Sequence, residues 1–161
     1  MTKNETKARG AVSPVKNLPD EHWLHFQYNY VEWFTSHLIN LLPYFDGDLT
    51  EMLILAIIGQ VHLKRYQDAQ KTDAAFNADE IFITASRLAD ITKLSRETIR
   101  RKLKKLEARG WIEKNPDASW RLYVDADGAK VHRDLKMLTA ETVTGLQRLI
   151  KVLSETAPEE P

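Results

Sequence analysis

Apolar side chains recur at three- and four-residue intervals between Asp20 and Leu41, which is the spacing of one face of an α-helix. This face is unusually aromatic, and its members are Trp23, Phe26, Tyr30, Phe34, Leu38 and Leu41. Proline is excluded from helix interiors, so we expect the helix to stop before Pro43. The pattern predicts a long amphipathic helix with an aromatic stripe.

A second helix is predicted after the turn at residues 43–47. Asp48 and Glu51 have the spacing of a capping box, and the apolar positions that follow have few polar interruptions. These features are typical of a buried central helix, which we expect to end near Tyr66. Residues 67–79 are polar and rich in Ala and Asp, which indicates a loop or a frayed helical end.

The middle of the chain predicts two short capped helices after a brief β-type run at Ile81–Ile83. Thr84 can cap the first helix, residues 85 to about 92, and Ser95 can cap the second. The second helix ends at Gly110, where a left-handed residue is favoured.

Two further β runs, Trp111–Glu113 and Trp120–Val124, flank a polar turn at Asn115–Ser119. The order is therefore strand, capped helix, tight turn, capped basic helix, glycine, strand, turn, strand. This is the order of a winged helix-turn-helix, in which the second helix enters the major groove of DNA.

The second helix of this motif has two different faces when its residues are projected at about 100° per residue. Ile99, Leu103 and Leu106 share a narrow arc, which we expect to pack on the first helix of the motif. The opposite arc, free to meet DNA, holds Glu97, Arg101, Lys104 and Ala108.

Charge is concentrated in the same place. The whole chain has a formal net charge of zero. Nine Lys and Arg against three Glu between Lys93 and Lys114 nevertheless give that stretch a local charge of +6. The molecule is therefore expected to have one basic face.

The C-terminal part predicts one more helix, starting near Thr139. Its apolar residues follow a/d heptad spacing over about two heptads, too short to hold a dimer alone. They are Val143, Leu146, Ile150 and Leu153. We expect a mainly α fold with a small β-wing. Its parts are a flexible tail (1–18), an N-terminal helical scaffold (19–80), the winged helix-turn-helix (81–124), a C-terminal helical segment (125–156) and a flexible tail (157–161).

The motif also resembles known families. Its residues are Leu94–Arg101, Leu103, Leu106–Glu107, Gly110 and Ile112, and they resemble the recognition helix and wing entry of bacterial regulators of the catabolite-activator and GntR types. The first resemblance implies that Arg96, Glu97 and Arg101 read bases. The order of long helices is similar to that of MarR-type regulators, which implies dimerisation through the terminal helices.

Base reading agrees with side-chain chemistry, because Arg offers a bidentate fork to guanine and Glu accepts from cytosine. Hydroxyls near helix N-termini and flanking cations suit phosphates. The phosphate candidates are Thr84, Ser86, Lys93, Ser95, Arg100, Lys104 and Lys105. In the wing, Lys114 and Arg121 are the only cations, and structural support explains the hairpin equally well.

The aromatic stripe has two interpretations. With Trp33 it could line a pocket for a small-molecule effector, but core or dimer packing is the more usual role. We therefore predict a homodimer interface made by Trp23, Phe26, Tyr30, Val143, Leu146, Ile150 and Leu153.

Other chemistries have little support. The chain has no cysteine, no phosphate-binding glycine loop and no nucleophile elbow, so we expect no enzyme and no cofactor. The spacing of His22, His25, His37 and His62 is a weak metal signal, and we expect no metal site. Asp125–Gly128 lacks the closing glutamate of a calcium loop and is expected to be a turn.

No targeting or membrane segment is apparent. The N-terminus has no apolar core, and the longest apolar run, Met52–Ile58, is far shorter than the ~20 residues of a membrane span. We expect a cytoplasmic location. The preferred function is a sequence-specific double-stranded DNA-binding regulator. The alternatives are a replication or partition factor and a winged helix that contacts proteins.

Overall fold

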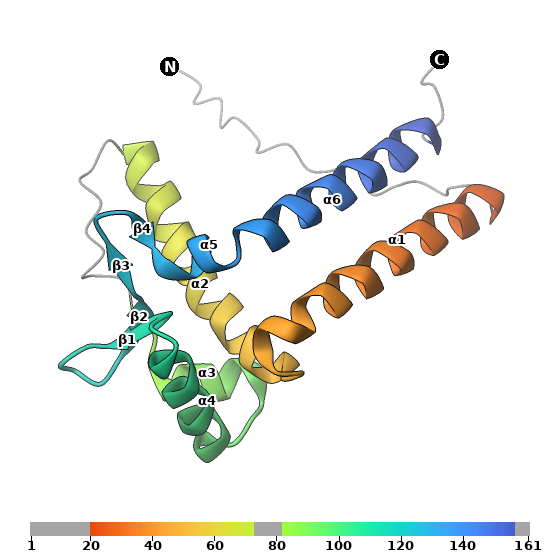
Figure 1. Ribbon diagram of the computed structural model, residues 1–161. Coiled ribbons are helices and arrows are strands. Elements are labelled where there is room, and N and C mark those ends of the chain that lie inside the picture. The colour runs from red at the N-terminus through yellow and green to blue at the C-terminus, as the bar shows by residue number, and fades with distance from the viewer. Residues whose placement is uncertain (1–19, 73–81, 157–161) are drawn as a thin grey trace, which may run out of the picture.

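The computed structural model describes residues 20–72 and 82–156 (Figure 1). The elements in order are α1 (Asp20–Leu41), the 3-10 helix η1 (Leu42–Phe45), α2 (Leu49–Thr72), α3 (Ala85–Thr92), α4 (Arg96–Ala108), β1 (Ile112–Lys114), β2 (Trp120–Leu122), β3 (Val124–Asp125), β4 (Gly128–Ala129), α5 (Lys130–Asp134) and α6 (Lys136–Thr156). In Figure 1, α1 and α6 form a two-helix arm that projects from a base containing α2, α3, α4 and the strands. This confirms the expected winged helix with flanking helices.

The predicted turn between the first two helices, at residues 43–47, is confirmed. Pro43 lies in η1, and Asp46 (φ 51°) and Gly47 (φ 78°) take left-handed conformations that turn the chain. The Glu51 amide donates to Asp48 Oδ1 at 3.1 Å, so Asp48 caps α2 as predicted. The Glu51 carboxylate is fully buried and lies beside cations of α4 instead.

The core of the base joins α2 to the helix-turn-helix. Ile99, Leu103 and Leu106 are fully buried, as the helical projection predicted. They meet α2 as well as α3, because Ile54 and Ile58 of α2 belong to the same buried cluster. The segments 19–80 and 81–124 therefore share one hydrophobic core.

The wing is a short antiparallel hairpin. β1 pairs with β2 in the register Ile112 with Leu122, and the turn between them contains Ala118 at φ 67°. Ile83 forms an isolated bridge to Trp120 through two backbone hydrogen bonds of 2.9 Å. The predicted strand at 81–83 is thus reduced to this bridge, and Ile81 lies outside the described residues.

Three predicted boundaries were wrong. α2 continues past Tyr66 to Thr72, because its polar residues are good helix formers; residues 73–79 lie outside the described part. Val124 does not extend β2 but pairs with Ala129 in a second hairpin. α6 begins at Lys136 rather than near Thr139, after the unpredicted α5.

The predicted turn at Asp125–Gly128 is confirmed as the connection between β3 and β4. The guanidinium of Arg133 donates to Asp125 at 2.6 and 2.8 Å and to the Gly128 carbonyl at 2.9 Å. The Asp125 carboxylate therefore ties this hairpin to α5.

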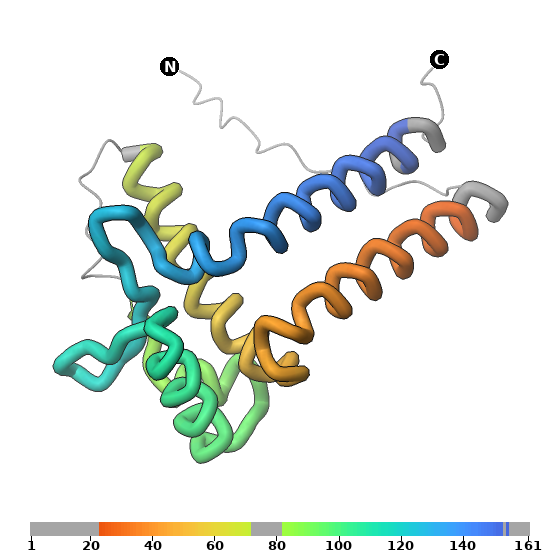
Figure 2. Tube along the Cα trace, viewed as in Figure 1, coloured from red at the N-terminus to blue at the C-terminus, as the bar shows by residue number. Residues whose placement is uncertain are grey.

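The arm is an antiparallel pair of helices (Figure 2). Trp33 of α1 lies on Gly145 of α6, where an added Cβ would stand 2.6 Å from the indole, so only glycine permits this approach. Nearer the base, Thr142 Oγ1 and His37 Nδ1 are 3.0 Å apart, and Asn40 donates to Glu141 at 3.1 Å. These contacts set the register of the two helices.

Asp134 links α5 to the start of the wing and predicts an acid-sensitive contribution to stability. Hydrogen bonds from Lys130 Nζ (2.5 Å) and Trp111 Nε1 (2.7 Å) lower the pKa of this carboxyl. Stabilisation by the ionised form is complete above the unfolded pKa of about 3.9 and is lost as pH falls through the lower folded pKa. We expect Asp134→Asn to lower the urea midpoint near neutral pH, with a difference that shrinks below about pH 4. A pH-independent difference would contradict this account.

Candidate nucleic-acid interface

Caps and left-handed residues define where α3 and α4 begin and end. Thr84 Oγ1 accepts from the Arg87 amide and Ser95 Oγ from the Thr98 amide, both at 3.1 Å, so both predicted caps are confirmed. Lys93 (φ 61°) makes the turn between the helices, and Gly110 (φ 68°) ends the second. The outer face of α4 is consequently presented beside the N-terminus of α3.

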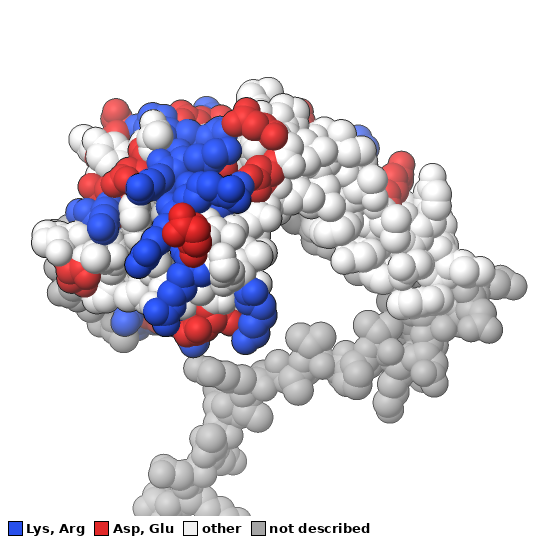
Figure 3. Space-filling view, turned by 90° about the horizontal axis from the view of Figure 1, so that it is seen from below, with Lys and Arg blue, Asp and Glu red and all other residues white. Residues whose placement is uncertain are grey.

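A groove of about 940 Å³ runs between α3, α4 and the wing, and we call it the wing groove. Its walls bring together eight of the residues proposed from the sequence: Thr84, Ser86, Glu97, Arg100, Arg101, Lys104, Lys105 and Lys114. Lys and Arg side chains gather on this part of the molecule in Figure 3. Segments separated in sequence thus form one concave, mainly basic surface.

Four proposed residues lie outside the lining of the wing groove. Arg96, Ser95 and Lys93 are exposed at the turn and the start of α4. Arg121 Nε donates to Glu113 Oε1 at 2.9 Å, across the β1–β2 pair, so its guanidinium is already engaged. The wing contributes Lys114 to the groove and, with it, the acidic Asp117.

An acidic cluster, which the sequence analysis did not anticipate, lies behind α4. Lys102 is buried and pairs with Asp48, while Arg109 donates to Asp46 Oδ2 at 2.6 Å and to the Tyr44 carbonyl at 2.5 Å. These two cations therefore face inward and do not add to the basic groove. The local charge of +6 overstated the charge presented outward.

Glu51 is the buried centre of this acidic cluster. Its Oε1 lies 3.4 Å from Arg109 Nε and its Oε2 lies 3.8 Å from Lys105 Nζ, yet neither oxygen accepts a hydrogen bond from the described residues. Burial, and then the charge of Lys105, lower the pKa of Lys102. The only sequence signal for the cluster was the Asp48–Glu51 spacing, which we interpreted as capping alone.

The histidine spacing was a weak signal for a metal site. Among the described residues, no group of three potential ligands could hold a metal ion. His37 faces Thr142 in the arm, and burial lowers its pKa. Burial, and then the charge of His132, lower the pKa of His62; the side chain of His22 lies outside the described part.

A membrane span requires a helix that is both long and apolar. Within residues 20–72 and 82–156, no helix combines the necessary length and apolarity.

The comparisons with known proteins agree with this geometry. Residues 58–123 match the family model described as the Crp-like helix-turn-helix domain. The match begins within α2 and ends just after β2, so it covers part of α2, all of α3 and α4, and the β1–β2 wing. No curated protein and no solved structure matches the chain.

The fold and the match together define the class: a winged helix-turn-helix with flanking helices, which supports a DNA-binding transcription regulator. The Crp-like family is a DNA-binding domain family and not an enzymatic one. The more specific resemblances to GntR and MarR regulators are not confirmed.

Proposed function

We propose that this protein is a homodimeric regulator that binds a specific double-stranded DNA sequence by placing α4 in the major groove. The observation that carries the proposal is the wing groove, in which the exposed face of α4, the N-terminus of α3 and Lys114 of the wing form one basic concavity. A major groove about 12 Å wide admits one helix, and phosphates on its rims would lie near the flanking elements.

Within this interface we assign base reading to Arg96, Glu97 and Arg101. All three are exposed on the first two turns of α4, the part of a recognition helix that contacts base edges. The hydroxyls at the caps and the remaining cations contact phosphates and give affinity that depends on salt. Those phosphate candidates are Thr84, Ser86, Lys93, Ser95, Arg100, Lys104 and Lys105.

The arm supports dimer formation. Along α1, Trp23 (49% exposed), Tyr30 (39%) and Phe34 (43%) remain open to solvent, and so do Leu24, Tyr28 and Ile39 on its other sides. α1 therefore has apolar side chains on more than one side, and α6 covers only one of these sides, which leaves apolar surface of the kind that is normally buried. We infer that a second copy of the chain covers the aromatic side.

The same side of the arm includes the apolar residues of α6. Counting at about 100° per residue from the contact of Trp33 with Gly145 places the aromatic stripe and Leu146 on one side of the pair. Val143 (48% exposed) and Ile150 (62%) flank Leu146 there, while the side chain of Leu153 lies outside the described part.

The first test is fluorescence anisotropy of the full chain with a pool of random duplexes across a salt series. Phosphate contacts predict binding at low salt and a steep linear fall of log affinity with log salt. Absence of duplex binding at low salt would reject the proposal and favour a protein-contacting winged helix.

Arg101→Ala should relax sequence selection. Loss of a bidentate contact to one base pair costs about 1–3 kcal/mol of discrimination. We expect binding-site selection to lose its preference at one position in each half-site. Arg65→Ala, on the exposed part of α2, provides a matched loss of charge and should leave the selected sequence unchanged. An unchanged preference in Arg101→Ala would remove that residue from the base-reading set.

A further inference from the structure

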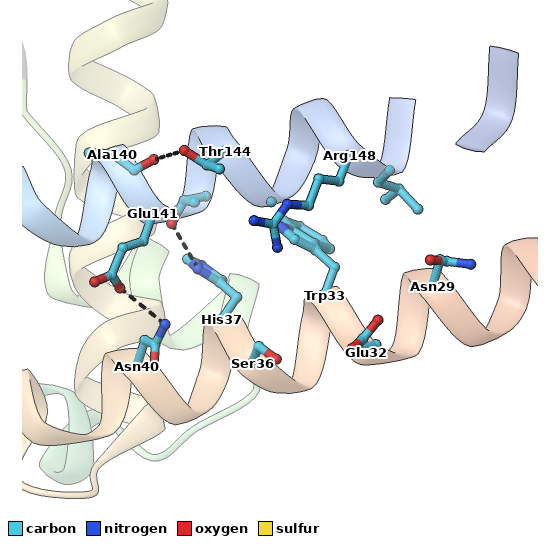
Figure 4. A pocket seen from close by; sticks show the side chains of 13 residues that line it. Asn29, Glu32, Trp33, Ser36, His37, Asn40, Ala140, Glu141, Thr144 and Arg148 are labelled. Carbon is cyan, nitrogen blue, oxygen red and sulfur yellow. Dashed lines mark hydrogen bonds between the residues drawn. The ribbon is translucent and has the colours of Figure 1, made fainter. Parts of the chain in front are cut away.

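A second groove, of about 470 Å³, lies between α1 and α6 in the arm, and we call it the arm groove (Figure 4). It is on the side of the helix pair opposite the aromatic stripe, by the same helical count from Trp33 and Gly145. Trp33 lines it, whereas none of the aromatic residues of the stripe, Trp23, Phe26, Tyr30 and Phe34, does. A dimer formed through the aromatic side would therefore leave the arm groove open.

The arm groove contains polar groups whose bonding capacity is unused. The indole N–H of Trp33 is buried and has no hydrogen-bond acceptor among the described residues. Leaving a buried donor unsatisfied costs about 1–3 kcal/mol, so a ligand that moves α1 and α6 apart far enough to reach this N–H would recover that cost. Because Gly145 has no side chain, the indole can sit deep between the helices.

Two opposite charges also face the groove without meeting. Arg148 of α6 and Glu32 of α1 both line it, and neither forms an ion pair or a hydrogen bond within the described part of the chain. Because the helices are antiparallel and Trp33 lies against Gly145, Glu32 and Arg148 are displaced toward the same end of the arm. Figure 4 shows the Arg148 guanidinium beside the Trp33 ring and Glu32 next to Trp33 on α1.

The other end of the groove is closed by satisfied groups. Asn40 donates to Glu141, and His37 is within hydrogen-bond distance of Thr142. Trp33 and His37 stack with ring centroids 5.7 Å apart and an interplanar angle of 4°. Burial lowers the pKa of His37, which favours the neutral imidazole and hence an uncharged aromatic surface beside Trp33.

We propose that the arm groove binds a free α-amino acid with an aromatic or large apolar side chain. Its carboxylate would accept hydrogen bonds from Arg148 and, once α1 and α6 have moved apart, from the buried Trp33 indole, and its ammonium group would pair with Glu32. Its side chain would lie along the surface formed by Trp33, His37 and Leu149. A zwitterion fits better than a simple anion or cation, because the unpaired groups have both signs.

Binding at this position has a physical route to the DNA interface. α1 leads directly into η1, and Arg109 at the end of α4 donates to Tyr44 and Asp46 at that junction. A ligand that changes the spacing of α1 and α6 would therefore move groups bonded to the recognition helix. This regulatory role rests on the proposed function, whereas ligand binding itself does not.

The test is isothermal titration calorimetry of the full chain with L-phenylalanine in the absence of DNA. We expect wild-type binding, and at least about a tenfold loss of affinity in both Arg148→Gln and Glu32→Gln, since each removes a charge-assisted contact. Lys136→Gln, an exposed change at the start of the same helix, is the control and should bind normally. Phenylacetate and phenethylamine, which lack the ammonium and carboxylate groups respectively, should each bind at least about tenfold more weakly than L-phenylalanine.

Several outcomes would overturn the proposal. They are the absence of L-phenylalanine binding to the wild type, unchanged affinity in Arg148→Gln, and equal binding of phenylacetate and L-phenylalanine. Because the assay contains no DNA, failure here is distinguishable from failure of the duplex-binding experiment. Tryptophan fluorescence compared between the wild type and Trp33→Phe gives a second readout, because the chain has four tryptophans and the ligand contacts the ring of Trp33.

Discussion

Ile150→Asp is expected to convert the protein to a monomer and to reduce its affinity for a two-half-site operator by at least about a hundredfold, through loss of avidity. Ile150 is 62% exposed on α6, so the change should leave the folded chain intact while placing two buried carboxylates in a two-fold interface. Sedimentation velocity would report the change, with the wild type at twice the 18.6 kDa mass of the chain.

The matched control is Thr144→Asp, which introduces the same charge on the opposite side of α6, in the lining of the arm groove. It should remain dimeric. A monomeric wild type would contradict the dimer proposal altogether. A dimeric Ile150→Asp variant would instead show that the chains associate through another face.

Asp48→Ala is expected to lower the free energy of unfolding by about 3–5 kcal/mol, because it removes a helix cap and the partner of the buried Lys102 ammonium group. The Lys102 side chain is only 9% exposed, so its ammonium group would lose its carboxylate while remaining largely shielded from water. The Glu51 amide would also lose the bond that starts α2. Urea unfolding followed by circular dichroism measures this loss.

Two further variants identify the cause of this loss of stability. Asp48→Asn combined with Lys102→Met keeps a capping side chain and removes both charges, so it should recover most of the stability. Asp90→Ala removes an exposed carboxylate of α3 and should change stability by less than about 0.5 kcal/mol. If Asp48→Ala were no more destabilising than Asp90→Ala, the buried pair would not stabilise the junction of α2 and α4.

Much of the fold was predictable because its signals are local. α1 ends at Leu41, two residues before Pro43, because proline does not fit inside an α-helix. Hydroxyl side chains cap the starts of α3 and α4, and Gly110 adopts the left-handed conformation that the end of α4 requires. The inward arc of α4 was predictable too, because helical periodicity alone separates Ile99 and Leu103 from Arg101. Eight residues lining the wing groove were also nominated from the sequence, some by helical periodicity and others by their charge or by a hydroxyl near a helix N-terminus.

Element ends were less predictable. The polar residues at the end of α2 are compatible with helix, loop or a frayed end, and neighbouring structure decides between these states. The separate β3–β4 hairpin depends on Asp125 and Arg133, which meet only after the chain has turned into α5. The sequence pattern around Val124 is equally compatible with a longer β2 and with a new strand.

The sequence by itself determined the class of protein, since capping, periodicity and clustered cations are properties of neighbouring residues. Only the tertiary structure decided which cations are available. Lys102 and Arg109 have the same local appearance as Arg101 and Lys104, but the acidic residues Asp46 and Asp48 of a distant segment turn them inward. The tertiary structure also brings Trp33 and Arg148, which are far apart in the chain, into one groove. Electrostatic pairing and pocket formation act through space, so they depend on the packing of segments and not on their order.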